Sequence, residues 1–333
     1  MSSWYPYRSS IVLDAEAMRF PDILKEIVIF LYVYDEERAK YAPIGTAFFV
    51  GLVSEDLFFP YLVTCRHVVE QHLNDGKIIH GRFNLAGDAG GVDYEAFPSE
   101  WVFHVDKTVD VAVLSWPQTN AKLPYRWAAL PFDKAIFKSR DAQPEGRGIK
   151  EGDDVFFIGL FAQYTGNERN FPIVRFGKIA LVTNEPIQTE LGSSVNLILE
   201  TQAYPGNSGS PLFIPTQTPD GTIVASLLGI IAGFWPDEQE VYVTGDKLIT
   251  YTHFGISHAT PATKISDVLF GEELMKKREK RKNSQHVNNM PIPAATQKAI
   301  KDGGITQQGF HSALKKAFKP DEEQTSDEGK SKT

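Results

Sequence analysis

The sequence predicts an all-β fold built from two successive groups of antiparallel strands. Short runs rich in β-branched and aromatic residues recur along most of the chain, and charged, glycine- or proline-containing turns separate them, a pattern typical of antiparallel barrels. Residues 117–149, rich in proline, lysine, arginine and aspartate, favour a connecting segment between the two groups. The length of 333 residues and the hydrophobic content of 42% suffice for two packed cores.

The first group of strands is expected within residues 24–116. The predicted strands are 27–34, 45–51, 58–63, 77–85, 92–97, 100–104 and 111–116. Residues 1–23 are aromatic and proline-containing without a clear period, so they are interpreted as an N-terminal extension.

The second group is expected within residues 150–270. The predicted strands are 155–159, 173–180, 195–200, 212–214, 227–233 and 255–261. Pro261 favours the start of a short closing helix over about residues 262–269.

Residues 271–333 form a polar tail whose composition predicts little buried core, partly disordered or with short helices at 294–301 and 307–318. A chain ending near Gly271 is therefore expected to fold and stay active. From Glu272 onward there are 13 Lys and Arg against 9 Asp and Glu, about +4, which leaves 21 against 33, about −12, in the body. The acidic body argues against nucleic-acid binding. The basic run 276–282 favours a solvated helix end, and the tail is a candidate surface for a protein partner.

The composition also limits compartment and cofactors. The chain shows no signal-peptide-like start and no run long enough to span a bilayer, and its one cysteine cannot form an intramolecular disulfide, so a reducing, cytoplasmic location is expected. The histidines lack metal-ligand spacing and no phosphate-binding glycine loop occurs, so neither a metal nor a cofactor is expected.

Three motifs at the edges of apolar runs carry the chemistry. They are Thr-Cys-Arg-His-Val-Val at 64–69, Asp-Val-Ala-Val-Leu at 110–114 and Gly-Asn-Ser-Gly-Ser-Pro at 206–211. The last alone could be an ordinary surface turn. Together the motifs supply a base (His67), a carboxylate (Asp110) and a serine (Ser208) that glycines allow into a sharp turn.

These motifs, with the run Gly-Thr-Ala-Phe-Phe-Val at 45–50, resemble the trypsin-like (chymotrypsin-fold) serine peptidases, particularly the Deg/Htr-type peptidase domains, over about residues 24–270. The order His, Asp, Ser along the chain agrees with that family. The resemblance implies two six-stranded antiparallel barrels with a short C-terminal helix. It also implies a serine endopeptidase acting on polypeptides, with the catalytic triad His67, Asp110 and Ser208 and an oxyanion hole made by the amides of Gly206 and Ser208. The polar tail is too short and too poor in apolar residues for the peptide-binding PDZ module that often follows such domains.

Two neighbours of these residues are alternatives for chemical roles. Asp106 could replace Asp110 as the carboxylate, but it adjoins Lys107, whereas Asp110 leads straight into an apolar run. Cys65 directly precedes Arg66 and His67 and is interpreted as a small buried apolar residue.

The resemblance also places a specificity pocket. Its expected lining is Gln202, Ala203, Ile231, Ala232 and Gly233. No acidic residue stands where selectivity for lysine or arginine would need one, so cleavage after small or medium uncharged residues is expected. Asn207 stands where secreted relatives carry the aspartate that pairs with a new N-terminus, which argues against activation by N-terminal processing. The alternative function is a catalytically silent peptidase-fold module that binds peptides or scaffolds a complex through its tail.

Overall fold

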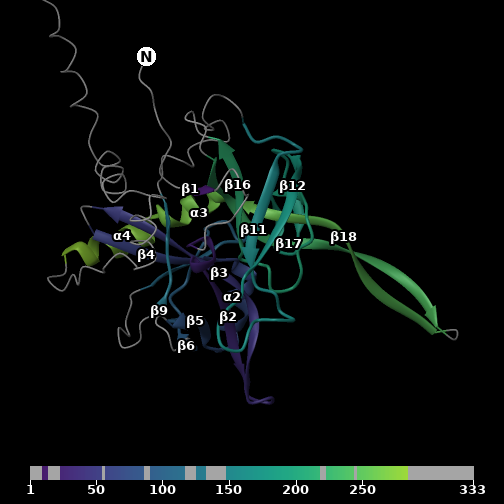
Figure 1. Ribbon diagram of the computed structural model, residues 1–333, viewed down its shortest axis with the longest axis horizontal. Coiled ribbons are helices and arrows are strands. Elements are labelled where there is room, and N and C mark those ends of the chain that lie inside the picture. The colour runs from purple at the N-terminus through teal and green to yellow at the C-terminus, as the bar shows by residue number, and fades with distance from the viewer. Residues whose placement is uncertain are drawn as a thin grey trace, which may run out of the picture.

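A computed structural model describes residues 10–13, 23–54, 57–85, 91–116, 125–132, 148–217, 223–243 and 246–283 (Figure 1). Two large sheets account for most of it, antiparallel except where β10 pairs with β3, and four helices lie beside them. Among the described residues no helix has the length and apolar character needed to cross a membrane.

The second sheet closes into a six-stranded barrel. Its strands are β11 (Asp154–Gly159), β12 (Ile173–Val182), β15 (Leu197–Glu200), β16 (Pro211–Gln217), β17 (Ile223–Val243) and β18 (Asp246–Pro261). The pairing runs β17-β16-β11-β12-β15-β18, and β18 pairs back with β17. A strand from the expected N-terminal extension, β1 (Ser10–Leu13), adds to β17 outside this ring.

The first sheet has nine strands and stays open. They are β2 (Val28–Asp35), β3 (Lys40–Ser54), β4 (Leu57–Thr64), β5 (Ile79–Leu85), β6 (Val92–Ala96), β7 (Val102–Phe103), β8 (Ala112–Ser115), β9 (Tyr125–Arg126) and β10 (Leu130–Pro131). The path runs β6-β5-β2-β3-β4-β8-β7, and β6 and β7 at its two ends do not pair.

The expectation of two closed six-stranded barrels is thus met by the second sheet and not by the first. The two-residue strand β7 is too short to carry a ladder beyond β8. Tightly packed aromatic rings fill the interior instead, including Phe49, Phe83, Trp116 and Trp127, all at most 4% exposed. The described part of the expected connection also belongs here, since β9 pairs with β5 and β10 with β3.

Two features of the second half have no counterpart in the predicted strands. Strands β13 (Ile187–Thr189) and β14 (Gly192–Ser194) form a separate hairpin. Strands β17 and β18 continue far past the barrel, their register running to Val243 opposite Asp246, and Figure 1 shows them as a long two-stranded arm that leaves the body.

The chain after the second barrel forms two helices, α3 (Ala262–Leu269) and α4 (Glu272–Asn283). The helix α3 agrees with the predicted closing helix. The start of the tail is not purely solvated, because Leu274 in α4 is fully buried and Arg278 is 8% exposed. Nη1 of Arg278 donates to the hydroxyl of Tyr61 (3.0 Å) and to the carbonyl of Leu269 (2.7 Å). The expectation of little buried core beyond residue 271 therefore does not hold for α4, where Leu274 and Arg278 are buried. The helices expected at 294–301 and 307–318 lie outside the described residues.

Candidate active site

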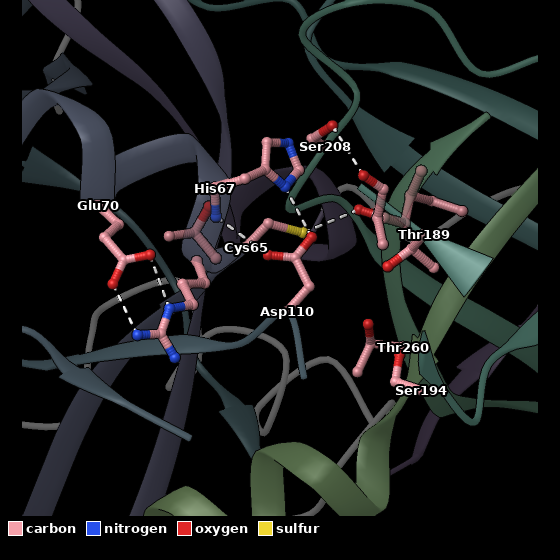
Figure 2. Close-up of polar contacts among 12 residues, drawn as sticks. Cys65, His67, Glu70, Asp110, Thr189, Ser194, Ser208 and Thr260 are labelled. Carbon is pink, nitrogen blue, oxygen red and sulfur yellow. Dashed lines mark hydrogen bonds and ion pairs between the residues drawn. The ribbon is translucent and has the colours of Figure 1, made fainter. Parts of the chain in front are cut away.

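His67 and Asp110 lie against each other at the edge of the first sheet. β4 ends at Thr64, and His67 lies in the first turn of α2 (Arg66–Asn74). Asp110 precedes β8, which pairs with β4. Figure 2 shows the carboxylate facing the imidazole: Asp110 Oδ2 lies 2.6 Å from His67 Nδ1, and Oδ1 accepts from the His67 backbone amide at 3.0 Å.

This pair defines the chemical state of the imidazole. A carboxylate is an acceptor, so Nδ1 carries the proton that it donates to Asp110, and Nε2 is left with a free lone pair. The second bond, from the His67 amide, holds the carboxylate on the backbone that carries the imidazole. His67 therefore has the tautomer of a general base, with Nε2 directed away from Asp110.

Ser208 lies in a sharp turn held by the first sheet. The turn needs backbone conformations that glycine adopts easily, with φ of +97° at Gly206 and +87° at Gly209. Thr46 of β3 forms two hydrogen bonds with the turn. Its amide donates to the Ser208 carbonyl (2.9 Å), and its hydroxyl donates to the Gly206 carbonyl (2.8 Å). A Cβ at Gly209 would lie 1.9 Å from the carbonyl oxygen of Thr46, so no larger residue fits this approach.

Some backbone amides of the turn donate hydrogen bonds and others are open, meaning that they have no acceptor among the described residues. The amides of Asn207, Gly209 and Ser210 donate to the carbonyls of Tyr204, Ile231 and Asn207, respectively. The amides of Gly206 and Ser208 have no acceptor in the part of the chain that the structure describes. Two unengaged donors beside a serine are what a developing oxyanion requires.

Asn207 holds the turn without a charge. It is 1% exposed, its Oδ1 accepts from the Tyr204 amide at 2.9 Å, and its Nδ2 donates to the Leu160 carbonyl at 2.5 Å. These neutral bonds occupy both ends of the carboxamide. The turn is therefore ordered without an ion pair to a new N-terminus.

The Ser208 hydroxyl points away from His67. Oγ donates to the carbonyl of Ala232 at 3.2 Å, and among the described residues no hydrogen bond joins it to His67. In Figure 2 the Ser208 side chain lies beside the imidazole with its hydroxyl directed at that carbonyl. Rotation about χ1 moves a serine hydroxyl between staggered positions, so the nucleophile–base contact needs only a change of rotamer.

His67, Asp110 and Ser208 line one cavity of about 440 Å³. Four of the five expected pocket residues also line it: Ala203, Ile231, Ala232 and Gly233. Gln202 does not; it is exposed, and its Oε1 accepts from the Tyr204 hydroxyl at 3.3 Å.

The sequence reasoning missed much of the cavity wall. The further lining includes Gln188, Thr189, Glu190 and Leu191 of the β13–β14 hairpin, Ser194, Asn196, Trp235 and His258. A short polar run before Gly192 is a hairpin signal, and alternation along 255–261 would have placed His258 on one barrel face. Neither signal indicates that these residues meet at Ser208.

A model of the trypsin-like peptidase domain matches residues 45–224, more than half of the chain. The chain belongs to the trypsin-like peptidase domain family. The matched segment runs from within β3 to the start of β17 and contains all three residues of the site.

The solved structures that the chain is similar to have low sequence identity. The MamO protease domain from Magnetospirillum magneticum (apo form) is 17% identical, with 74% of this chain and 96% of that chain covered and a TM-score of 0.44. An inactive serine-to-alanine mutant of Rv3671c from M. tuberculosis H37Rv is 17% identical, with 78% and 95% covered and a TM-score of 0.39. The inactive form of the Rv3671c protease is 18% identical, with 75% and 94% covered and a TM-score of 0.37. No curated protein matches the chain.

Cys65 lies close to the two polar residues of this peptidase-family site. Its sulfur, an imidazole nitrogen of His67 and a carboxylate oxygen of Asp110 lie within 4.8 Å of one another, a distance that would suit a metal ion. Each atom already has a partner, however, since the thiol donates to the carbonyl of Ile231 (3.2 Å) and the Asp110 carboxylate faces His67. Burial raises the pKa of the Cys65 thiol well above its usual value, which opposes the thiolate that a metal would need. The three groups are therefore better described as hydrogen-bonded side chains than as a metal site.

Opposing effects determine the basicity of His67. Burial lowers its pKa, but the hydrogen bond that His67 donates to Asp110, the Asp110 charge and the charge of Glu190 together outweigh burial, so the pKa is raised above the ordinary 6.5. A base must be neutral to accept a proton, and a raised pKa means that His67 becomes charged at a higher pH than a free histidine. Activity that depends on this base is consequently lost early as the pH falls.

We expect Glu190→Gln to move the acid limb of kcat/KM to lower pH, because removing that charge lowers the pKa of His67. The measurement is kcat/KM against pH at low salt, and added salt should shrink the difference, since Glu190 is exposed. Glu185→Gln, a change at another exposed residue of the same segment, is the matched control. Coincident profiles for Glu190→Gln and wild type at low salt would contradict the assigned interaction.

Proposed function

We propose that the protein is a serine endopeptidase that cleaves polypeptides through Ser208, His67 and Asp110. The observation that carries the proposal is the hydrogen-bonded His67–Asp110 pair in the same cavity as Ser208, whose own amide and that of Gly206 are open. Membership of the trypsin-like peptidase family supports the polypeptide substrate.

The reaction follows from this arrangement. The Ser208 hydroxyl turns from Ala232 to Nε2 of His67, which takes its proton as the oxygen attacks the substrate carbonyl carbon. The carbonyl oxygen becomes negative and accepts hydrogen bonds from the Gly206 and Ser208 amides. His67 then gives the proton to the leaving amine, and the carbon–nitrogen bond breaks to leave an acyl-enzyme ester.

Water completes the cycle by the same steps. His67 takes a proton from water as its oxygen attacks the ester carbonyl, and the proton returns to the Ser208 oxygen as the acid product leaves. Asp110 stays ionised and stabilises the imidazolium that forms in both halves. No other group is required to balance the reaction.

Labelling by a fluorophosphonate probe tests the proposal without knowledge of the substrate. The wild-type protein should form a covalent adduct, whereas Ser208→Ala should form none and His67→Ala should react far more slowly, with folding checked by circular dichroism. Ser193→Ala is the matched control, because Ser193 is an exposed serine on the nearby hairpin that bonds to Gln188. Equal labelling of Ser208→Ala and wild type would overturn the assignment of the nucleophile.

One observation favours the alternative of a silent peptide-binding module, namely the bond from Ser208 to Ala232 where an active enzyme needs a bond to His67. The same probe decides between them. A folded wild-type protein that stays unlabelled but binds peptides in the cavity would be the silent module.

A further inference from the structure

His258 is a titratable residue of the cavity that the proposed reaction does not use. It lies on β18, opposite Gly233 of β17 in the barrel register. The two residues touch closely enough that a Cβ at Gly233 would come within 2.8 Å of His258 Nε2. Both line the cavity that contains Ser208. His258 is thus placed to contact a substrate side chain held there.

The imidazole of His258 lacks hydrogen-bond partners within the described chain. Its Nδ1 is fully buried and unpaired, and its Nε2 has no partner either but is not among the fully buried atoms. The ring packs against Trp235, with ring centroids 4.9 Å apart. Buried polar groups are normally paired, so the ring can still form a hydrogen bond, and Nε2 is the nitrogen that is not fully buried.

The ring is a neutral donor. Burial lowers the pKa of His258 to about 4, so almost none of it is protonated at pH 7. A neutral imidazole has one N–H, and leaving a buried N–H unpaired is costlier than leaving a lone pair unpaired. The proton therefore belongs on Nε2, which offers an N–H to a ligand.

The floor of the cavity adds a second donor in a rigid setting. Asn196 is 2% exposed, its Nδ2 donates to Ser194 Oγ at 2.8 Å, and its Oδ1 accepts from the Thr260 hydroxyl at 3.3 Å. Because Ser194 Oγ accepts this bond, its own proton is free for another acceptor. Figure 2 shows Ser194 and Thr260 side by side beneath the triad.

The charges of the lining oppose an anionic ligand. The cavity is lined by two carboxylates, Asp110 and Glu190, and by no lysine or arginine among the described residues. A carboxylate side chain would find no cation there, and a cationic side chain would meet the Nε2–H of His258. An uncharged group that accepts hydrogen bonds avoids both conflicts.

We propose that His258 and Ser194 make the pocket selective for a carboxamide side chain, glutamine or asparagine, on the residue whose carbonyl Ser208 attacks. This inference rests on the proposed function and narrows the expected uncharged substrates to a class defined by its amide oxygen. That oxygen has two lone pairs and can accept from both donors. A site with buried polar groups rejects an isosteric side chain that leaves them unpaired.

The test compares peptide aminomethylcoumarins Ac-Ala-Ala-Pro-X, with X as glutamine, asparagine, glutamate, leucine or lysine. At pH 7 we expect kcat/KM for glutamine or asparagine to exceed that for leucine by about tenfold or more. His258→Ala should remove this preference, measured within that variant as the ratio of kcat/KM for glutamine to kcat/KM for leucine. Leu181→Ala, at an exposed residue of β12 outside the cavity, is the control that should keep the preference.

A binding measurement keeps the two proposals separate. Calorimetry of Ser208→Ala with uncleaved Ac-Ala-Ala-Pro-Gln-Ala and with its leucine counterpart needs no turnover, and the glutamine peptide should bind more tightly only while His258 is present. A labelled enzyme that prefers leucine, glutamate or lysine overturns the carboxamide assignment and leaves the peptidase intact. An unlabelled protein that still binds the glutamine peptide through His258 retains this assignment and overturns the peptidase.

Discussion

Replacing Asp110 by asparagine should lower turnover by about 10⁴, the loss typical of this position in a trypsin-type triad. Asp110 accepts from both Nδ1 and the backbone amide of His67. An asparagine that keeps the bond from the amide turns its NH₂ toward Nδ1, which must then be the acceptor. The proton moves to Nε2, where it blocks the base. The measurement is kcat/KM on an activated peptide, together with the rate of fluorophosphonate labelling.

Asp106→Asn is the matched control for this prediction. Asp106 accepts from the amide (2.9 Å) and the hydroxyl (2.8 Å) of Thr108 and makes no contact with His67. Its replacement should leave turnover nearly unchanged. A larger loss for Asp106→Asn than for Asp110→Asn would show that the wrong carboxylate has been assigned.

Removing helix α4 should cost much of the protein's stability. A chain ending at Gly271 loses the buried Leu274 and the contacts that Arg278 makes with Tyr61 and Leu269. Deleting one buried leucine side chain costs roughly 2–5 kcal/mol, and the lost hydrogen bonds add to that. For a domain of this size the unfolding midpoint should fall by about 10 °C relative to a chain ending at Asn283, which keeps α4.

Point variants in α4 test whether the loss of stability comes from buried side chains or from the shorter chain. Leu274→Ala should reproduce much of the loss, whereas Met275→Ala, at a residue 47% exposed, should change the midpoint little. No residue of α4 lines the cavity, so folded molecules should label at Ser208 as before. Equal unfolding midpoints for chains ending at 271 and at 283 would show that α4 adds little to stability, as the composition of the tail suggested. Loss of labelling with an unchanged midpoint would show instead that α4 orders the active site.

The three residues that line the cavity together, His67, Asp110 and Ser208, could be picked out because they reside in short contiguous motifs. The turn that carries Ser208 needs glycines at fixed neighbouring positions, and His67 and Asp110 lie next to strands that are apolar runs. Local conformation and residue type dominate at such places. The alternation of strands and turns likewise predicts a chain built on two groups of strands, and the structure is mostly β, with two large sheets and a separate two-stranded hairpin.

The residues that surround the chemistry could not be predicted in the same way. His258 reaches the cavity through the pairing of β18 with β17, and Glu190 through a hairpin that pairs with neither sheet. Gln202 is adjacent to Ala203 in the sequence, but it faces solvent and does not line the cavity. Whether such a residue lines the cavity depends on strand register and on the direction of its side chain. A shift of one residue along a strand moves every side chain to the opposite face of the sheet.

The amino-acid sequence by itself determined most of the strands of the two large sheets, the glycine turn around Ser208 and the order of histidine, aspartate and serine, because each depends on a few neighbouring residues. Only the tertiary structure decided that the first sheet stays open, that α4 packs on β4 and that an unpaired histidine lies in the cavity of Ser208. Those outcomes depend on contacts between segments tens to hundreds of residues apart. Their free energies come from burial and pairing that exist only once the chain has folded.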